Sequence, residues 1–166
     1  STTEETYMEV IRGKTAMLFE ASTHSAAALA GATPEQSEAL RTFGDHLGVA
    51  FQLVDDLLDY RGDAETLGKN VGDDLAEGKP TLPLIYTMRE GTPEQAALVR
   101  KAIQKGGIED LESIRAAVEA SGSLEYTAQL ARDYVARAIV CLEALPPSEY
   151  RDALVELSEF AVARTH

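Results

Sequence analysis

Apolar residues recur along this chain at steps of three and four positions, which is the spacing of an amphipathic helix. The clearest run ends before the proline pair at 146–147, and its members are Leu124, Ala128, Ala131, Val135, Ala138, Leu142 and Leu145. No segment alternates apolar and polar residues over the length of a strand. The pattern therefore predicts an all-α protein.

Capping residues, prolines and glycines divide this pattern into separate helices. Thr33, Pro34 and Gln36 have the order of an N-cap, a first-turn proline and a capping box, and the sequence from Thr92 to Gln95 repeats it. Glycines follow several apolar runs and indicate helix ends. The predicted helices cover about 3–30, 33–60, 80–90, 92–105, 109–121, 124–145 and 149–164.

Polar residues gather on one face of the predicted helix 33–60. At about 100° per residue, Gln52, Asp55, Asp56 and Asp59 fall within an arc of about 100°, and Asp45 joins it from two turns earlier. The opposite face is apolar. We expect the helix to pack by its apolar face and to turn its carboxylates toward solvent or a cavity.

Carboxylates this close repel one another unless a cation lies between them, so the arc predicts a divalent metal site. Oxygen ligands alone favour Mg²⁺, Mn²⁺ or Ca²⁺ over zinc. Gly44 and Gly48 border the arc, and we expect their missing side chains to leave open space above it. An EF-hand is excluded because no register supplies its glycine and final glutamate. The remaining alternative is an ordinary solvated charged face.

A Gly-rich segment follows, and it carries Lys69 and Lys79 together with Asp73 and Asp74. Mg²⁺ in proteins is commonly held by a few carboxylates and by substrate phosphates, to which lysine adds a point charge. The combination favours a metal-bridged diphosphate. Upstream, the adjacent pair at positions 14 and 15, a lysine and a threonine, could reach the same anion from another helix.

Three runs together carry a family resemblance: the Lys-Thr pair at 14–15, FQLVDDLLD at 51–59 and GKNVGDDLAEGKPTLPL at 68–84. The chain resembles the trans-polyprenyl diphosphate synthases over nearly its whole length. Two further runs, GTPEQ at 91–95 and GSLEYT at 122–127, are similar to the octaprenyl branch in bacteria. The resemblance implies the all-helical isoprenoid synthase bundle, in which two aspartate-rich motifs lie on facing helices.

Only the second of these motifs occurs here, so the resemblance implies that residues 1–166 are a single helical domain equivalent to the C-terminal half of the enzyme. It implies a metal site for Mg²⁺, with Mn²⁺ as an alternative, on Asp55, Asp56 and Asp59, of which the first and last are the direct ligands. It assigns the diphosphate of the allylic substrate to Lys14, Lys69 and Lys79. Thr15 and Gln52 match the polar pair beside the reacting carbons.

The resemblance implies a prenyltransferase that condenses isopentenyl diphosphate with an allylic diphosphate, extending an all-trans chain to the octaprenyl length. It also implies a homodimer, and the missing first motif predicts that this half is inactive without an upstream half. Two alternatives remain. A terpene cyclase uses similar chemistry, although its second metal motif usually differs from DDLLD. A non-catalytic, regulatory helical subunit would explain the missing motif.

Composition narrows the class of protein further. The chain has 166 residues, 45% of them hydrophobic, and a formal net charge of −13. Such acidity argues against nucleic-acid binding, which depends on basic residues. The single cysteine, Cys141, excludes an internal disulfide framework. No signal peptide and no apolar run near the length of a membrane span is evident, so we expect a cytoplasmic protein without a membrane span.

Overall fold

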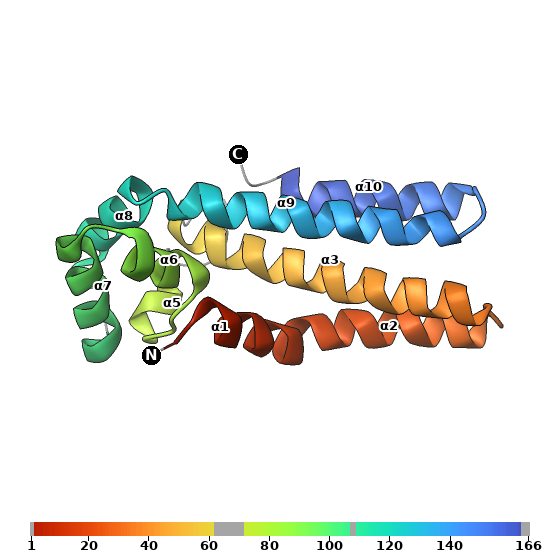
Figure 1. The fold of residues 1–166 in the computed structure, drawn as a ribbon, viewed down its shortest axis with the longest axis horizontal. Coiled ribbons are helices and arrows are strands. Elements are labelled where there is room, and N and C mark those ends of the chain that lie inside the picture. The colour runs from red at the N-terminus through yellow and green to blue at the C-terminus, as the bar shows by residue number, and fades with distance from the viewer. Residues whose placement is uncertain (1, 62–71, 107–108, 164–166) are drawn as a thin grey trace. The chain divides into compact units, whose positions relative to one another are not determined.

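A computed structural model describes residues 2–61, 72–106 and 109–163, and Figure 1 shows them as a series of helices. The described residues contain no strand, which confirms the predicted all-α class. Within the same ranges, no helix is both long and apolar enough to cross a membrane. The α-helices are α1 (Glu4–Ile11), α2 (Met17–Leu29), α3 (Pro34–Arg61), α5 (Asp73–Ala76), α6 (Leu82–Glu90), α7 (Pro93–Lys105), α8 (Leu111–Ala120), α9 (Ser123–Cys141) and α10 (Glu149–Ala163).

The capping signals in the sequence act as predicted. The hydroxyl of Thr33 accepts from the backbone N–H of Gln36, whose side chain accepts from the backbone N–H of Thr33 in return. Thr92 and Gln95 form the same reciprocal pair at the start of α7. Each box satisfies two backbone donors that a helix start would otherwise leave without partners. The helix starts at residues 34 and 93 are therefore confirmed.

The first predicted helix is not a continuous α-helix. Between α1 and α2 lies a π-helical turn, η1 (Arg12–Ala16), in which the hydrogen-bonded ring is one residue wider than in an α-helix. A second short element, η2 (Leu142–Ala144), closes α9 with a 3₁₀ turn. The short helix α5 is also an addition, because no helix was predicted in the Gly-rich segment between residues 60 and 80.

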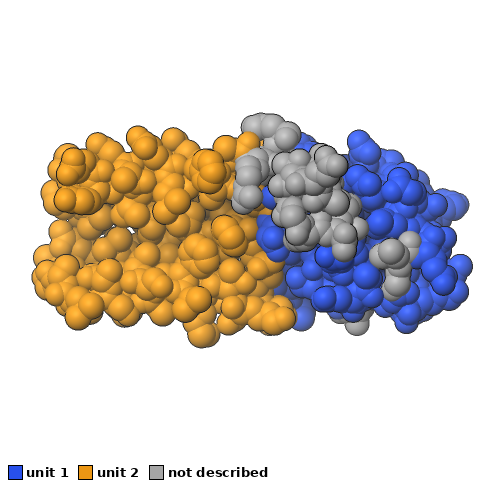
Figure 2. Space-filling view, turned by 180° about the vertical axis from the view of Figure 1, so that it is seen from behind, with its two compact units in different colours: residues 1–7, 55–128 blue, residues 8–54, 129–166 orange. Residues whose placement is uncertain are grey.

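The described residues form two compact units, which Figure 2 colours separately. Unit 1 consists of residues 1–7 and 55–128, and unit 2 of residues 8–54 and 129–166. Each unit therefore combines two separate stretches of the chain, and both α3 and α9 contribute to each of them.

The core of unit 1 is formed where the C-terminal turns of α3 pack with α5 to α8 and the start of α9. Its buried members are Leu57, Tyr60, Leu75, Leu84, Val99, Ile114, Val118, Leu124 and Ala128. Because α6 and α7 supply members of this core, it fixes the segment that follows α5 against the end of α3. That segment carries Lys79.

The core of unit 2 lies where α3 packs with the C-terminal part of α9 and with α10. Phe43, Leu47, Ala138 and Leu142 are its buried members, and Leu154 is among the partly buried residues packed against them. Figure 1 shows α10 lying alongside that part of α9. The apolar seam predicted from Leu124 onward is thus core, as its 3.6-residue period indicates.

Gly44 and Gly48 do not border open space, and the expectation that they would is wrong. A Cβ atom at Gly44 would lie 2.6 Å from the carbonyl oxygen of Phe19, and one at Gly48 would lie 2.6 Å from the Cα of Ala16. Both glycines are buried. Their missing side chains instead allow the backbones of α3 and of the η1–α2 segment to approach closely.

Candidate functional site

The predicted acidic residues lie in the last turns of α3, within unit 1. Asp56 and Asp59 are fully buried, and Asp55 is half-buried. Two of the four carboxylates in the predicted arc, Asp56 and Asp59, therefore do not face solvent, and the expectation is wrong for them. Buried carboxylates require hydrogen bonds or cations as partners, because the loss of water around a charged group is costly.

Lys79 supplies one such cation. Its Nζ atom lies 3.2 Å from Oδ1 of Asp74 and 3.7 Å from Oδ1 of Asp56. The backbone N–H of Lys79 also donates to the carbonyl of Asp74 at 2.9 Å, across a turn in which Gly78 has a φ of 69°. This turn directs the lysine back toward the end of α3, where its Nζ atom contacts Asp56.

The electrostatics of Lys79 follow from these contacts. Partial burial alone would lower the pKa of its ammonium, but the negative charges of Asp56 and Asp74 outweigh that effect and raise the pKa above its usual value. The side chain is nevertheless 40% exposed. Lys79 is thus a charged donor at neutral pH, and it keeps access to solvent and to a ligand.

Tyr7 is the second partner of the acidic residues, and sequence reasoning missed it. Its hydroxyl donates to Oδ2 of Asp56, and its side chain is buried. Burial, followed by the charge of Asp56, raises the pKa of the phenol well above its ordinary value, so Tyr7 remains a donor at neutral pH. A single tyrosine in an amphipathic helix carries no signal that would separate it from an ordinary core residue.

Unit 2 holds the other predicted polar residues. The hydroxyl of Thr15 donates to Oε1 of Gln52 at 2.8 Å, which confirms that these two residues are neighbours. Lys14 precedes Thr15 in the π-helical turn η1, and its side chain is exposed. Wide turns of this kind occur frequently at functional sites, because they re-aim side chains on an otherwise regular helix.

Asp45, the earliest member of the predicted acidic face, belongs to a different network in unit 2. Its carboxylate lies 3.8 Å from Nε of Arg12 and 3.3 Å from Nδ1 of His46. Arg12 also donates to the hydroxyl of Tyr134 at 3.1 Å. These contacts give Asp45 structural partners within its own unit.

The structure therefore brings the predicted site residues together in two groups, one in each unit. Unit 1 holds Asp55, Asp56, Asp59 and Lys79, and unit 2 holds Lys14, Thr15 and Gln52. Lys69 lies outside the described residues.

The donor atoms at the end of α3 fit a hard cation by their chemistry, because all of them are carboxylate oxygens. In the described part of the chain, however, no three Asp, Glu, His or Cys side chains are arranged so that they could hold a metal ion. The carboxylate of Asp56 already contacts Tyr7 and Lys79, whereas Asp55 is the carboxylate that keeps partial exposure. The assignment of metal to these residues stays a prediction.

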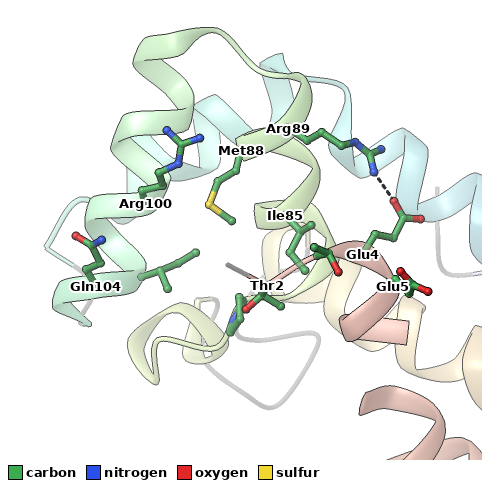
Figure 3. Close-up of a pocket in the computed structure, with 11 residues that line it drawn as sticks. Thr2, Glu4, Glu5, Ile85, Met88, Arg89, Arg100 and Gln104 are labelled. Atoms are coloured by element: carbon green, nitrogen blue, oxygen red, sulfur yellow. Dashed lines mark hydrogen bonds and ion pairs between the residues drawn. The ribbon is translucent and has the colours of Figure 1, made fainter. Parts of the chain in front are cut away.

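Unit 1 also contains a cavity that is lined by other residues. It measures about 670 Å³ and lies between the residues at the start of α1 and the helices α6 and α7 (Figure 3). Ile85, Met88 and Ile103 give it an apolar lining, and Arg100 and Gln104 add polar groups. None of the predicted site residues described by the structure lines this cavity.

Comparison with known proteins identifies the family. The model of the polyprenyl synthetase family matches residues 1–121. The octaprenyl diphosphate synthase of Escherichia coli is 54% identical over 98% of the chain and 50% of its own length, and an all-trans-nonaprenyl-diphosphate synthase of Rhodobacter capsulatus is 52% identical over the same shares. The chain thus spans about half the length of these curated relatives.

Solved structures agree with the sequence comparison. The polyprenyl synthase of Caulobacter crescentus, crystallised with calcium and isoprenyl diphosphate, superposes with a TM-score of 0.93 at 43% identity, covering 100% of this chain and 51% of that protein. The geranylgeranyl pyrophosphate synthase of Corynebacterium glutamicum, crystallised with isoprenyl diphosphate and magnesium, gives a TM-score of 0.88 at 32% identity, covering 96% and 46%. On this sequence identity and this fold, the chain belongs to the polyprenyl synthetase family.

Proposed function

We propose that this chain forms the C-terminal half of a trans-polyprenyl diphosphate synthase, which condenses isopentenyl diphosphate with an allylic diphosphate into a long all-trans polyprenyl diphosphate. The observation that carries the proposal is the position of Lys79, an ammonium group held beside Asp56 and Asp74 yet 40% exposed. The 54% identity to an octaprenyl diphosphate synthase supports the same reaction and favours the octaprenyl length.

The allylic diphosphate binds first through lysine side chains in this proposal. We assign this role to three lysines, Lys14, Lys69 and Lys79, each of which would add a point charge that neutralises part of the anion. An ammonium placed where negative charge grows on the leaving diphosphate stabilises the transition state more than the bound substrate. The acidity of the whole chain makes such local cations necessary.

Asp55, Asp56 and Asp59 would hold Mg²⁺, with Mn²⁺ as the alternative. Once bound there, the metal supplies a positive charge that offsets the charge developing on the leaving diphosphate. Two structural relatives crystallised with calcium or magnesium together with isoprenyl diphosphate support a divalent metal of this kind.

Thr15 and Gln52 act on the carbon skeleton. Departure of the diphosphate leaves an allylic cation, and the double bond of isopentenyl diphosphate attacks it, after which a proton is lost. Because the O–H group of Thr15 donates a hydrogen bond to Oε1 of Gln52, the lone pairs of the Thr15 oxygen are left to face a cation. The hydrogen-bonded pair thus provides an oriented dipole without a formal charge that would trap the cation.

The proposed enzyme needs more than this chain. Relatives are about twice as long, and the first aspartate-rich motif of the family does not occur in this sequence. We therefore propose that an upstream half completes the site, that the chain alone is inactive, and that the complete enzyme is a homodimer.

The direct test uses Mg²⁺, farnesyl diphosphate and labelled isopentenyl diphosphate, with and without an added upstream half from a polyprenyl synthase relative. Chromatography of the dephosphorylated products gives their chain length. Long-chain product only in the presence of the upstream half is the expected result. No product in either case, with both halves folded, would instead identify this chain as a non-catalytic subunit.

A further inference from the structure

Tyr7 contacts Asp56 from α1, a helix that holds none of the predicted site residues. It lies in α1, 49 positions from Asp56 in the sequence, and its side chain is 4% exposed. Its hydroxyl donates to Oδ2 of Asp56, a residue with no exposed surface. A hydrogen bond to a buried carboxylate is among the stronger polar contacts in a protein, and its removal leaves an acceptor that water cannot easily reach.

The two oxygens of the Asp56 carboxylate have different partners. Oδ2 accepts from Tyr7, whereas Oδ1 lies 3.7 Å from Nζ of Lys79. Rotation of the carboxylate about its Cβ–Cγ bond would break the first contact. The hydroxyl of Tyr7 thereby keeps the other oxygen directed at Lys79, and Asp74 at 3.2 Å completes the pair of carboxylates that holds the ammonium.

The turn of α1 before Tyr7 is itself firmly held. Glu4 accepts at 2.7 Å from Nη1 of Arg89, a bond drawn in Figure 3, and at 2.7 Å from the hydroxyl of Tyr126. The Arg89 guanidinium also lies 5.3 Å from the centre of the Tyr86 ring, which stacks on Tyr126 at 4.5 Å. Charge-assisted hydrogen bonds and a stacked arginine fix this turn. Tyr7, three residues later, is fixed with it.

We propose that Tyr7 is a positioning residue for diphosphate binding, which orients Asp56 so that Lys79 is held where the diphosphate is bound. The inference rests on the proposed function of Lys79. It assigns no contact between Tyr7 and substrate, because the phenol is buried behind Asp56.

A double-mutant cycle on Tyr7 and Lys79 tests the inference, with inorganic diphosphate in Mg²⁺ buffer as the ligand and calorimetry as the readout. Tyr7→Phe keeps the ring and removes only the donor. We expect it to weaken diphosphate binding about three- to tenfold. This is less than the full effect of losing a hydrogen bond to a charged group, because Tyr7 acts on the ligand only through Asp56 and Lys79. In a Lys79→Met background, the same substitution is expected to change the affinity less than about twofold. A purely structural role would give equal effects in both backgrounds.

Two further variants complete the design. Tyr60→Phe removes a hydroxyl from another buried tyrosine of unit 1 and is the matched control, expected to leave diphosphate affinity unchanged. Tyr126→Phe removes one of the two donors to Glu4. If Tyr7→Phe does not fold, Tyr126→Phe replaces it in the double-mutant cycle with Lys79→Met, and we expect a smaller loss of diphosphate affinity.

The outcomes separate the inference from the proposed function. Wild-type binding that Lys79→Met weakens and Tyr7→Phe does not would overturn the role of Tyr7 alone. Failure of the wild-type protein to bind diphosphate, or full binding by Lys79→Met, would overturn the function proposed for Lys79 and the inference with it.

Discussion

Gly48→Ala tests whether close helix packing sets the spacing of Thr15 and Gln52. The added Cβ would lie 2.6 Å from the Cα of Ala16 and 3.1 Å from its Cβ, whereas ordinary contacts begin at 3.4 Å. The obstacle is backbone, so the two helical segments must separate by about 0.8 Å. Ala16 follows Thr15 directly, and Gln52 lies one turn beyond Gly48. A hydrogen bond of 2.8 Å would therefore lengthen beyond the usual limit of about 3.2 Å.

The expected loss of stability follows from two opposing terms. Forcing a methyl group into a packed contact costs about 1–3 kcal/mol. Alanine in place of glycine in a helix returns up to about 1 kcal/mol. We expect a net loss of about 1–2 kcal/mol in the free energy of unfolding, which urea titration followed by circular dichroism would register as a midpoint lower by about 1 M.

Gly13→Ala is the matched control. Position 13 also lies in a helical turn, but nothing comes within 4 Å of a Cβ placed there. The same substitution should leave stability unchanged or raise it by up to about 1 kcal/mol. Equal urea midpoints for the two variants would refute the reasoning that Gly48 is a packing contact. Retention of product formation by Gly48→Ala in the completed enzyme would refute its link to Thr15 and Gln52.

Three further predictions concern the carboxylates, the lysine and the buried phenols. Asp55→Asn should weaken Mg²⁺-dependent diphosphate binding at least about tenfold, measured by calorimetry. It should change the free energy of unfolding by less than about 0.5 kcal/mol, measured by urea titration. An unchanged metal requirement would contradict the assignment. Lys79→Met should weaken the binding of inorganic diphosphate more than that of Mg²⁺ alone, and equal losses would indicate that the turn before it has collapsed. Burial raises the pKa of Tyr60, so its contribution to stability is present below the unfolded pKa of about 10 and is lost as the pH rises above it. Between pH 8 and pH 11, the urea midpoint should thus fall less for Tyr60→Phe than for the wild-type protein. An identical fall in the two proteins would exclude this residue as the cause.

Local signals in the sequence predicted the helices well. Thr33 with Gln36 and Thr92 with Gln95 specify their own backbone bonds within one turn, so the starts of α3 and α7 follow from the residues alone. The period of the α9 seam likewise reported the face that is buried. Such features depend on residues near one another in the chain, and no knowledge of the remaining fold is needed.

Features that depend on distant segments were not predictable in the same way. Gly48 was assigned to open space, because the sequence does not reveal that Ala16 packs against it. The two partners of the buried Asp56 are distant in sequence, since Tyr7 lies well before it and Lys79 well after it. The pairing of Thr15 with Gln52 was expected only through family resemblance, since 37 residues separate them.

Because of the π-helical turn at Arg12–Ala16, the packing of this segment depends more on how many residues it contains than on which residues they are. Each residue added to or removed from a helix rotates everything beyond it by about 100°. Ile11 and Ala16, on either side of the wide turn, are both buried in unit 2. Deleting one residue between them would restore regular α-helical geometry and turn one of the two away from the core. In sequence alignments of this family, a one-residue gap here would therefore indicate a rebuilt site, even where lysine and threonine are still present.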